Sequence, residues 1–170
     1  MLGALMNLQR VFRHLFAPDW LVVRVFPHAA LRRIEAAVRQ SEASHRGELR
    51  VAVEAGVGLL PLLRGVTPRG RALEAFARLR VWDTEENSGV LIYLQLVDRD
   101  IEIVADRGIS ALVGQAQWDA ICHRMEKAFR ARRFEQGVLD GIAEITTLLN
   151  THFPARNKNP DELPNRPVML

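Results

Sequence analysis

The segment of residues 90–97, VLIYLQLV, constrains the fold most, because nearly all of its side chains are apolar. Such a run is typical of a central strand that is covered on both faces of its sheet. A second strand-like segment, IEIVA at 101–105, follows after only a short polar link at 98–100. So short a link cannot hold a crossover connection, so the two segments predict an antiparallel hairpin.

The chain before this hairpin predicts a helix between two extended segments. LVVRVF at 21–26 resembles a short strand or a buried extended segment. Residues 28–46 carry apolar side chains at helical spacing, with Gly47 as a plausible C-terminal cap. ELRVAVEA at 48–55 alternates between polar and apolar residues, which predicts a strand with one face more deeply buried.

Helical signals dominate the other segments. Thr67 is a good N-cap and Pro68 suits the first helical position, which predicts a helix over 68–80. Two further helices are predicted by apolar side chains at helical spacing: Trp118, Ile121, Cys122, Met125, Ala128 and Phe129 in the first, and Val138, Ile142, Ile145 and Leu149 in the second. Gly137 and Gly141 mark a place where another backbone can approach closely.

The order of these elements predicts an α/β fold, a three-layer α/β/α sandwich with a small mixed β-sheet. A right-handed crossover should make the strands that begin at 48 and 90 parallel. We expect an N-terminal helix and extended segment over 1–26, one α/β domain over 27–150, and a tail over 151–170. The tail is rich in Pro and Asn, which predicts an extended or disordered segment.

The first residues, MLGALMNLQRVFRHLF (1–16), form an amphipathic helical pattern. The helix could pack on its own domain or on a partner protein, and that partner could be membrane-associated; alternatively, the helix makes a peripheral contact with a membrane surface. The segment lacks the basic start and cleavage site of a signal peptide, and charged residues interrupt every apolar run that could span a bilayer. We therefore expect a cytoplasmic protein, peripheral to the inner membrane if this helix binds lipid.

Composition and missing motifs narrow the function. The net charge is +3, but arginines alternate with acidic residues throughout, so we expect no nucleic-acid partner. Cys122 is the one cysteine and lies on an apolar helix face, which indicates a core thiol. The five histidines are scattered, and the sequence has neither a Gly-x-Ser-x-Gly elbow nor a phosphate-binding loop that ends in Lys-Ser/Thr.

Oxygen-bearing side chains crowd the loop at 83–88, DTEENS, which we call the acidic loop. Ca²⁺ and Mg²⁺ prefer such oxygen ligands. An antiparallel return of the hairpin brings Asp106 back toward the acidic loop, so the candidate metal ligands are Asp83, Glu86, Asn87 and Asp106. The alternative is a solvated acidic loop that pairs with Arg107 and Arg80.

A second acidic group, Asp98 and Asp100, marks the turn of the hairpin. A strand of about eight residues at 3.3 Å each spans roughly 25 Å, so this turn cannot share an ion with the acidic loop.

The sequence resembles the TPM-domain family, whose plant members are thylakoid acid-phosphatase-like proteins involved in photosystem repair. The resemblance covers about residues 28–150. Four sequence segments carry the resemblance and occur in the same order as in the family: HRGELRVAVE, RALEAFARLRVWDTEENSGVLIYLQLVDRDIEIVADRGI, WDAICHRMEKAFR and RFEQGVLDGIAEITTLL. The best single marker is ENSGVLIYL.

This resemblance implies an α/β/α sandwich and, in some members, divalent-cation binding near the acidic loops with reported phosphatase activity. Carried over residue by residue, it implies roles for Glu86, Asn87, Asp98 and Asp106. Two hypotheses follow. The domain is either a non-enzymatic binding or accessory module, or a cation-assisted phosphatase of phosphomonoesters, in which Arg107 is available to bind the phosphate.

Overall fold

The computed structural model describes residues 12, 14, 20–58, 61–62, 64–156 and 160–170. The helices are α2 (Trp20–Val25), α3 (His28–Glu42), α5 (Pro68–Arg78), α6 (Arg107–Ser110), α7 (Gln115–Arg130) and α8 (Phe134–His152), and the strands are β1 (Glu48–Glu54), β2 (Gly89–Gln95), β3 (Asp100–Ala105) and β4 (Val168–Met169). The predicted helix over 1–16 lies outside the described residues except for Phe12 and His14. Of the helices described, none is long and apolar enough to cross a membrane.

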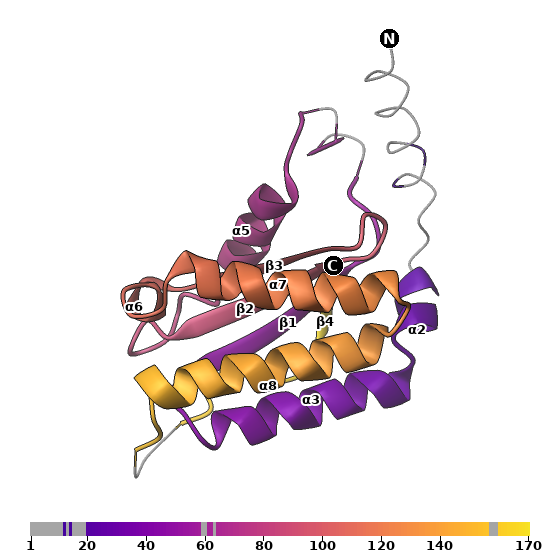
Figure 1. Cartoon of the computed structure of the whole chain (residues 1–170). Helices are drawn as coiled ribbons and strands as arrows, with labels where there is room; N and C mark the ends of the chain where they lie inside the picture. Colours follow the sequence, from indigo (N-terminus) through magenta and orange to yellow (C-terminus); the bar gives the residue numbers. More distant parts are fainter. Residues whose placement is uncertain (1–11, 13, 15–19, 59–60, 63, 157–159) are drawn as a thin grey trace.

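The four strands form one mixed sheet in the order β3-β2-β1-β4, shown in Figure 1. β1 and β2 are parallel, and β2 and β3 form the antiparallel hairpin, which confirms both predicted pairings. In β1 the odd-numbered residues Leu49, Val51 and Val53 face the larger core. The next residue on the other face, Ala52, belongs to a smaller core. The sheet therefore buries both faces, as the apolar run at 90–97 predicts.

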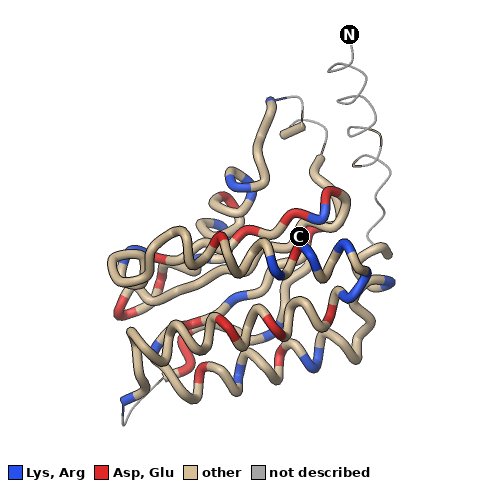
Figure 2. Tube along the Cα trace, in the orientation of Figure 1, with Lys and Arg blue, Asp and Glu red and all other residues tan. Residues whose placement is uncertain are grey.

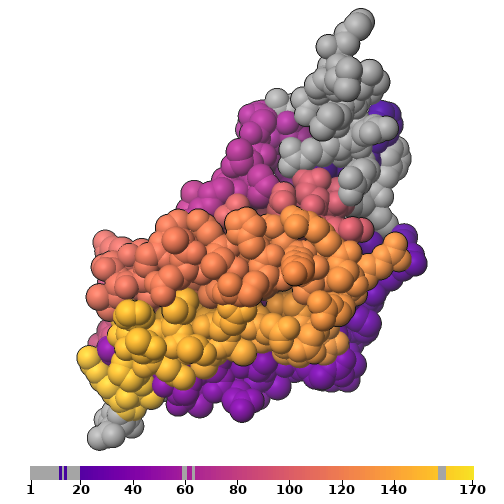
Figure 3. Space-filling model, viewed as in Figure 1, coloured from indigo at the N-terminus to yellow at the C-terminus, as the bar shows by residue number. Residues whose placement is uncertain are grey.

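Helices cover the two faces unequally, which gives the predicted α/β/α arrangement. On one face α3, α7 and α8 form a continuous layer in the space-filling view (Figure 3). On the other face α5 packs against β2 and β3, with Thr67 Oγ1 accepting a hydrogen bond from the backbone N–H of Gly70 as the predicted N-cap. Burial raises the pKa of the Cys122 thiol to about 12, which agrees with a core residue.

The glycine pair of α8 allows α7 to approach closely. A Cβ atom on Gly141 would lie 2.4 Å from the sulfur of Met125, and one on Gly137 would lie 2.9 Å from the Cβ of Ala128. Both neighbours belong to α7, so the close approach predicted from this pair is confirmed.

Two local predictions in the N-terminal part are wrong. Residues 21–26 are helical up to Val25, because that conformation places Val22 and Phe26 one turn apart, and both are buried in the larger core. The predicted helix over 28–46 ends at Glu42, with Ala43 as its C-cap instead of Gly47. Ser44 terminates it by donating its hydroxyl and its backbone N–H to the carbonyl of Ser41.

The described residues 160–170 of the tail are extended and lie against the sheet. Val168 and Met169 pair with β1 as the parallel edge strand β4, and the N–H of Leu170 donates to the carbonyl of Val53. Leu163 belongs to the smaller core. The segment 160–170 therefore completes the sheet edge and, as described below, one end of the candidate site.

Candidate functional site

The acidic loop and the start of α6 meet at the end of the hairpin, as the sequence predicts. Asn87 has φ 52°, and its carbonyl accepts a hydrogen bond from the N–H of Gly108 at 3.1 Å. The Asn87 Oδ1 accepts another from Arg107 Nε at 2.9 Å. Asp106 is the N-cap of α6, and its N–H donates to the carbonyl of Gly89 at 2.8 Å. Asn87, Asp106 and Arg107 thus lie together.

Two other predicted ligands are engaged with arginines. Glu86 forms ion pairs with Arg46 and with Arg156, the second at 3.1 Å. Asp83 is exposed and pairs with Arg80 at 2.5 Å, as expected for a solvated acidic loop. The structure therefore brings Asn87 to Asp106 but directs Asp83 and Glu86 to cationic partners. A cation held by all four residues stays a prediction.

The turn with Asp98 and Asp100 lies at the opposite end of the hairpin, as expected. Asp98 Oδ2 is 3.0 Å from His14 Nε2, and Asp100 pairs with Gln95 as the first residue of β3. This turn therefore anchors His14 to the hairpin and takes no part in the acidic loop.

A different carboxylate cluster forms where α3 leads into β1. Glu42 is the last residue of α3 and Glu48 is the first of β1, so the short connection returns the second carboxylate to the first. Asp161 of the tail completes a group in which one carboxylate oxygen from each residue lies within 4.8 Å of the other two. Among the described residues, no other set of three acidic, histidine or cysteine side chains lies so close together. We call these three residues, with Asn165, the carboxylate pocket.

The tail holds this pocket together through backbone and side-chain hydrogen bonds. Glu48 Oε2 accepts from the N–H groups of Glu162 at 3.2 Å and Leu163 at 3.0 Å. Asn165 Nδ2 donates to Asp161 Oδ2 at 3.1 Å. Glu42 Oε1 accepts from the N–H of Leu49 at 2.7 Å, so the residue that ends the helix also caps the strand start.

The pocket is a cavity of about 340 Å³, and one residue that lines it has an unpaired oxygen acceptor. Asn165 lines it and is only 7% exposed, yet its Oδ1 has no hydrogen-bond partner in the structure. Two guanidinium groups also line the cavity, but Arg39 pairs with Glu35 and Arg156 pairs with Glu86. Arg50 of β1 also interacts electrostatically with Glu42.

Burial changes the protonation of these groups. Burial, with a smaller contribution from the carboxylates of Glu48 and Asp161, raises the pKa of Glu42 to about 8. Burial also raises the pKa of Glu48 to about 7. Without a cation, Glu42 is therefore largely protonated at neutral pH, because the low-dielectric surroundings penalise a second buried negative charge.

His45 lies between Glu42 and Glu48 in sequence but belongs to a separate chain of hydrogen bonds. Its Nδ1 accepts from the N–H of Gly47 at 3.2 Å, so Nε2 carries the proton and donates to Ser41 Oγ at 2.7 Å. Ser41 Oγ in turn lies 2.6 Å from Thr146 Oγ1 of α8. Burial lowers the pKa of His45 to about 4, so the imidazole is neutral and fixes the connection between α3 and β1.

The comparisons with known proteins identify the family. A profile of the TPM domain matches residues 23–148. The chain belongs to the TPM domain family. Among solved structures it is similar to the NMR structure of the BA42 protein from the psychrophilic bacterium Bizionia argentinensis, with a TM-score of 0.74 and 30% sequence identity over 84% of this chain and 93% of that one. No curated protein matched.

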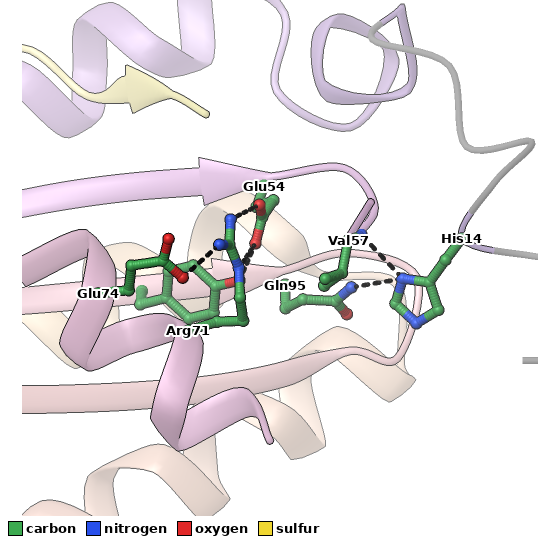
Figure 4. A network of polar contacts seen from close by, with 7 residues as sticks. His14, Glu54, Val57, Arg71, Glu74 and Gln95 are labelled. Atoms are coloured by element: carbon green, nitrogen blue, oxygen red, sulfur yellow. Dashed lines mark hydrogen bonds and ion pairs between the residues drawn. The ribbon is translucent and has the colours of Figure 1, made fainter. Parts of the chain in front are cut away.

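Glu54, the last residue of β1 in this TPM domain, is part of a second buried cluster, which Figure 4 shows. Glu54 accepts hydrogen bonds from the Tyr93 hydroxyl and from the guanidinium of Arg71, which also binds Glu74 at 2.6 Å. Burial, followed by the hydrogen bond to Glu54, raises the pKa of Tyr93. The cluster ties α5 to the sheet, and its partners satisfy one another, so we assign it a structural role.

Sequence reasoning missed the carboxylate pocket because half of it comes from the tail. Glu42 and Glu48 flank a short turn, which is a usable signal, but nothing in the pattern at 151–170 indicates that Asp161 and Asn165 return to them. The closest predicted residue is Glu86, which reaches the rim of the pocket only through Arg156.

The raised pKa of Glu42 predicts a pH-dependent stability for the cation-free TPM domain. An unfolded glutamate releases its proton near pH 4.5, whereas folded Glu42 retains it up to about pH 8. The contribution is therefore lost as pH rises through 8, and we expect the free energy of unfolding to fall by about 1 kcal/mol between pH 7 and 8.5. This window lies above the ordinary pKa of histidine, so His45, which has the opposite sign, does not interfere.

Urea unfolding in a chelator at these two pH values measures the effect. Glu42→Gln is the matched control, because the amide is neutral at both and keeps an oxygen for the N–H of Leu49. A wild-type protein whose stability changes no more than that of Glu42→Gln would contradict the assignment.

Proposed function

We propose that this TPM domain is a non-enzymatic binding module that holds a divalent cation, Ca²⁺ or Mg²⁺, in the carboxylate pocket. The observation that carries the proposal is the unpaired, buried Oδ1 of Asn165 in a residue that lines the same cavity as three carboxylates, one oxygen of each lying within 4.8 Å of the others. A buried polar oxygen without a partner is rare in folded proteins, and a cation would satisfy it.

The donor set fits a hard cation. Glu42, Glu48 and Asp161 offer carboxylate oxygens and Asn165 offers an amide oxygen, which are the ligand types that Ca²⁺ and Mg²⁺ prefer. These residues would hold the cation between the sheet and the tail. Bound there, its charge would stabilise the ionised form of Glu42, which burial disfavours, so binding should release protons and strengthen as pH rises.

A cation in this position supports a role as a binding module. Two of its ligands belong to the core of the domain and two to the tail, so binding would strengthen the attachment of residues 160–170 to β1. Cation binding would thereby fix the shape of the sheet edge that a partner protein would meet.

Cation-assisted hydrolysis of phosphomonoesters is the second candidate, and one observation favours it. Asp106 Oδ2 is buried without a hydrogen-bond partner, and the guanidinium of the following residue, Arg107, donates to Asn87 Oδ1. The Asp106 carboxylate could hold the cation, and Arg107 could bind the phosphate. A hydrolysis assay beside the cation-binding experiment separates the two candidates.

Thermal unfolding with and without Ca²⁺ or Mg²⁺ tests the proposal at pH 8. At a concentration about 100 times the Kd, a ligand that binds only the folded state adds about 2.7 kcal/mol, or roughly 5–10 °C in Tm for a chain of this size. We expect this shift in the wild type and its loss in Asp161→Asn. Asp161 is exposed, so this isosteric change should not disturb folding.

The matched control is Asp83→Asn, which removes the same charge from the acidic loop and should keep the full shift. If Asp83→Asn loses the shift and Asp161→Asn keeps it, the cation lies in the acidic loop and the proposed pocket is wrong. Cation-dependent hydrolysis of p-nitrophenyl phosphate that is abolished by Asp106→Asn would favour the second candidate.

A further inference from the structure

The end of the molecule opposite the carboxylate pocket combines exposed apolar and basic side chains. On α2, Trp20 is 57% exposed and Val23 is 41% exposed, although both are large apolar residues. The guanidinium of Arg24 lies 5.8 Å from the centre of the Trp20 ring. Tryptophan and arginine side by side are characteristic of surfaces that lie at the boundary between water and lipid.

The turn between α7 and α8 adds further positive charge to this end. Val25 of α2 lines a cavity of about 400 Å³ together with Arg132 and Arg133 of the turn, so the two segments are neighbours. Both arginines are exposed, and neither forms an ion pair with a described carboxylate. Figure 2 shows basic positions on α2 and on the adjoining end of α7 and α8.

We propose that this surface, formed by α2 and the α7–α8 turn, docks on an anionic lipid membrane. We call it the α2 surface. Arginines without carboxylate partners complement phosphate head groups, and the exposed Trp20 and Val23 can enter the interfacial region. The sequence before Trp20 supports this occupant, because residues 1–16, a short distance ahead of α2 in the chain, carry an amphipathic pattern.

An acidic protein could also meet the basic side chains, but the aromatic and aliphatic residues favour lipid. A membrane accepts Trp20 and Val23 without a shaped pocket, whereas a protein partner would need a complementary apolar hole for each. The inference is independent of the proposed cation site, which uses other residues at the other end of β1.

Flotation of the full chain with vesicles tests the inference. We expect the wild type to float with phosphatidylcholine vesicles that contain phosphatidylglycerol and to stay in solution with phosphatidylcholine alone. Each basic residue near an anionic surface contributes about 1 kcal/mol, so Arg132→Glu/Arg133→Glu should lower the partition constant at least about tenfold.

The matched control is Arg64→Glu/Arg78→Glu, which changes the net charge equally at exposed positions before and on α5. It should keep the partition constant within about threefold of the wild type, because neither arginine belongs to the α2 surface. A blue shift of tryptophan emission on vesicles, lost in Trp20→Phe, would place that ring in lipid. Failure of the wild type to float, or equal losses in both double variants, would overturn the inference.

Discussion

Gly89→Ala is expected to destabilise the domain by about 3 kcal/mol or more, because overpacking against backbone cannot be relieved by a side-chain rotation. A Cβ atom on Gly89 would lie 1.8 Å from the carbonyl oxygen of Val81. Val81 is fully buried, and its N–H donates to the carbonyl of Phe76, so the clashing group cannot move without disturbing α5. Urea unfolding measures the loss.

Gly58→Ala is the control for this substitution. Its nearest atom would be a Pro61 carbon at 3.9 Å, an ordinary van der Waals contact, so we expect a change within about 0.5 kcal/mol. If the two variants were equally stable, the approach of Val81 to β2 would be looser than the structure shows. A large difference would also explain the ENSGV marker of the family sterically: at Gly89 the strand has room only for hydrogen.

Glu54→Ala is expected to cost about 3–5 kcal/mol, the usual loss when one partner of a buried ion pair is removed. The variant leaves the hydroxyl of Tyr93, which is fully buried, without its acceptor. It also leaves the guanidinium of Arg71, whose side chain is 13% exposed, with Glu74 alone. The effect on the free energy of unfolding should therefore come mainly from groups that remain, and less from the contact itself.

Glu74→Ala tests whether the loss depends on burial, because Glu74 pairs with the same arginine. The Glu74 side chain is 59% exposed, so its pair with Arg71 should contribute less than about 1 kcal/mol. A double-mutant cycle of Glu54→Ala with Tyr93→Phe would give the coupling between the hydroxyl and the carboxylate. Equal losses in Glu54→Ala and Glu74→Ala would show that Glu54 is solvated after all.

Much of the fold follows from local sequence rules. The apolar run at 90–97 and the short link after it predict the hairpin, and Thr67 with Pro68 predicts the start of α5. The prediction of an extended segment at 21–26 was wrong, because a short run rich in β-branched and aromatic residues does not show whether a neighbouring strand is available for pairing. No described strand pairs with it, and the helical form reaches the core through Val22 and Phe26.

The candidate site was only partly predictable, for a related reason. The meeting of Asn87 with Asp106 follows from the hairpin register, which local rules supply. The carboxylate pocket depends on a tail of low hydrophobicity that returns to β1, and such long-range returns leave no local periodicity. The sequence shows a glutamate near the end of a predicted helix and another at the start of a predicted strand, Glu42 and Glu48. It does not show that both side chains are buried.

The alternation along β1 has a consequence for how the strand finds its place. Its three charged residues, Glu48, Arg50 and Glu54, share one face, and the apolar Leu49, Val51 and Val53 share the other. A slip by one residue would turn all three charges into the apolar layer beneath α3 and α8 and would place Leu49, Val51 and Val53 among the polar partners on the other buried face. Misaligned pairing with β2, or exchange of this strand between two molecules in a shifted register, is thereby strongly penalised.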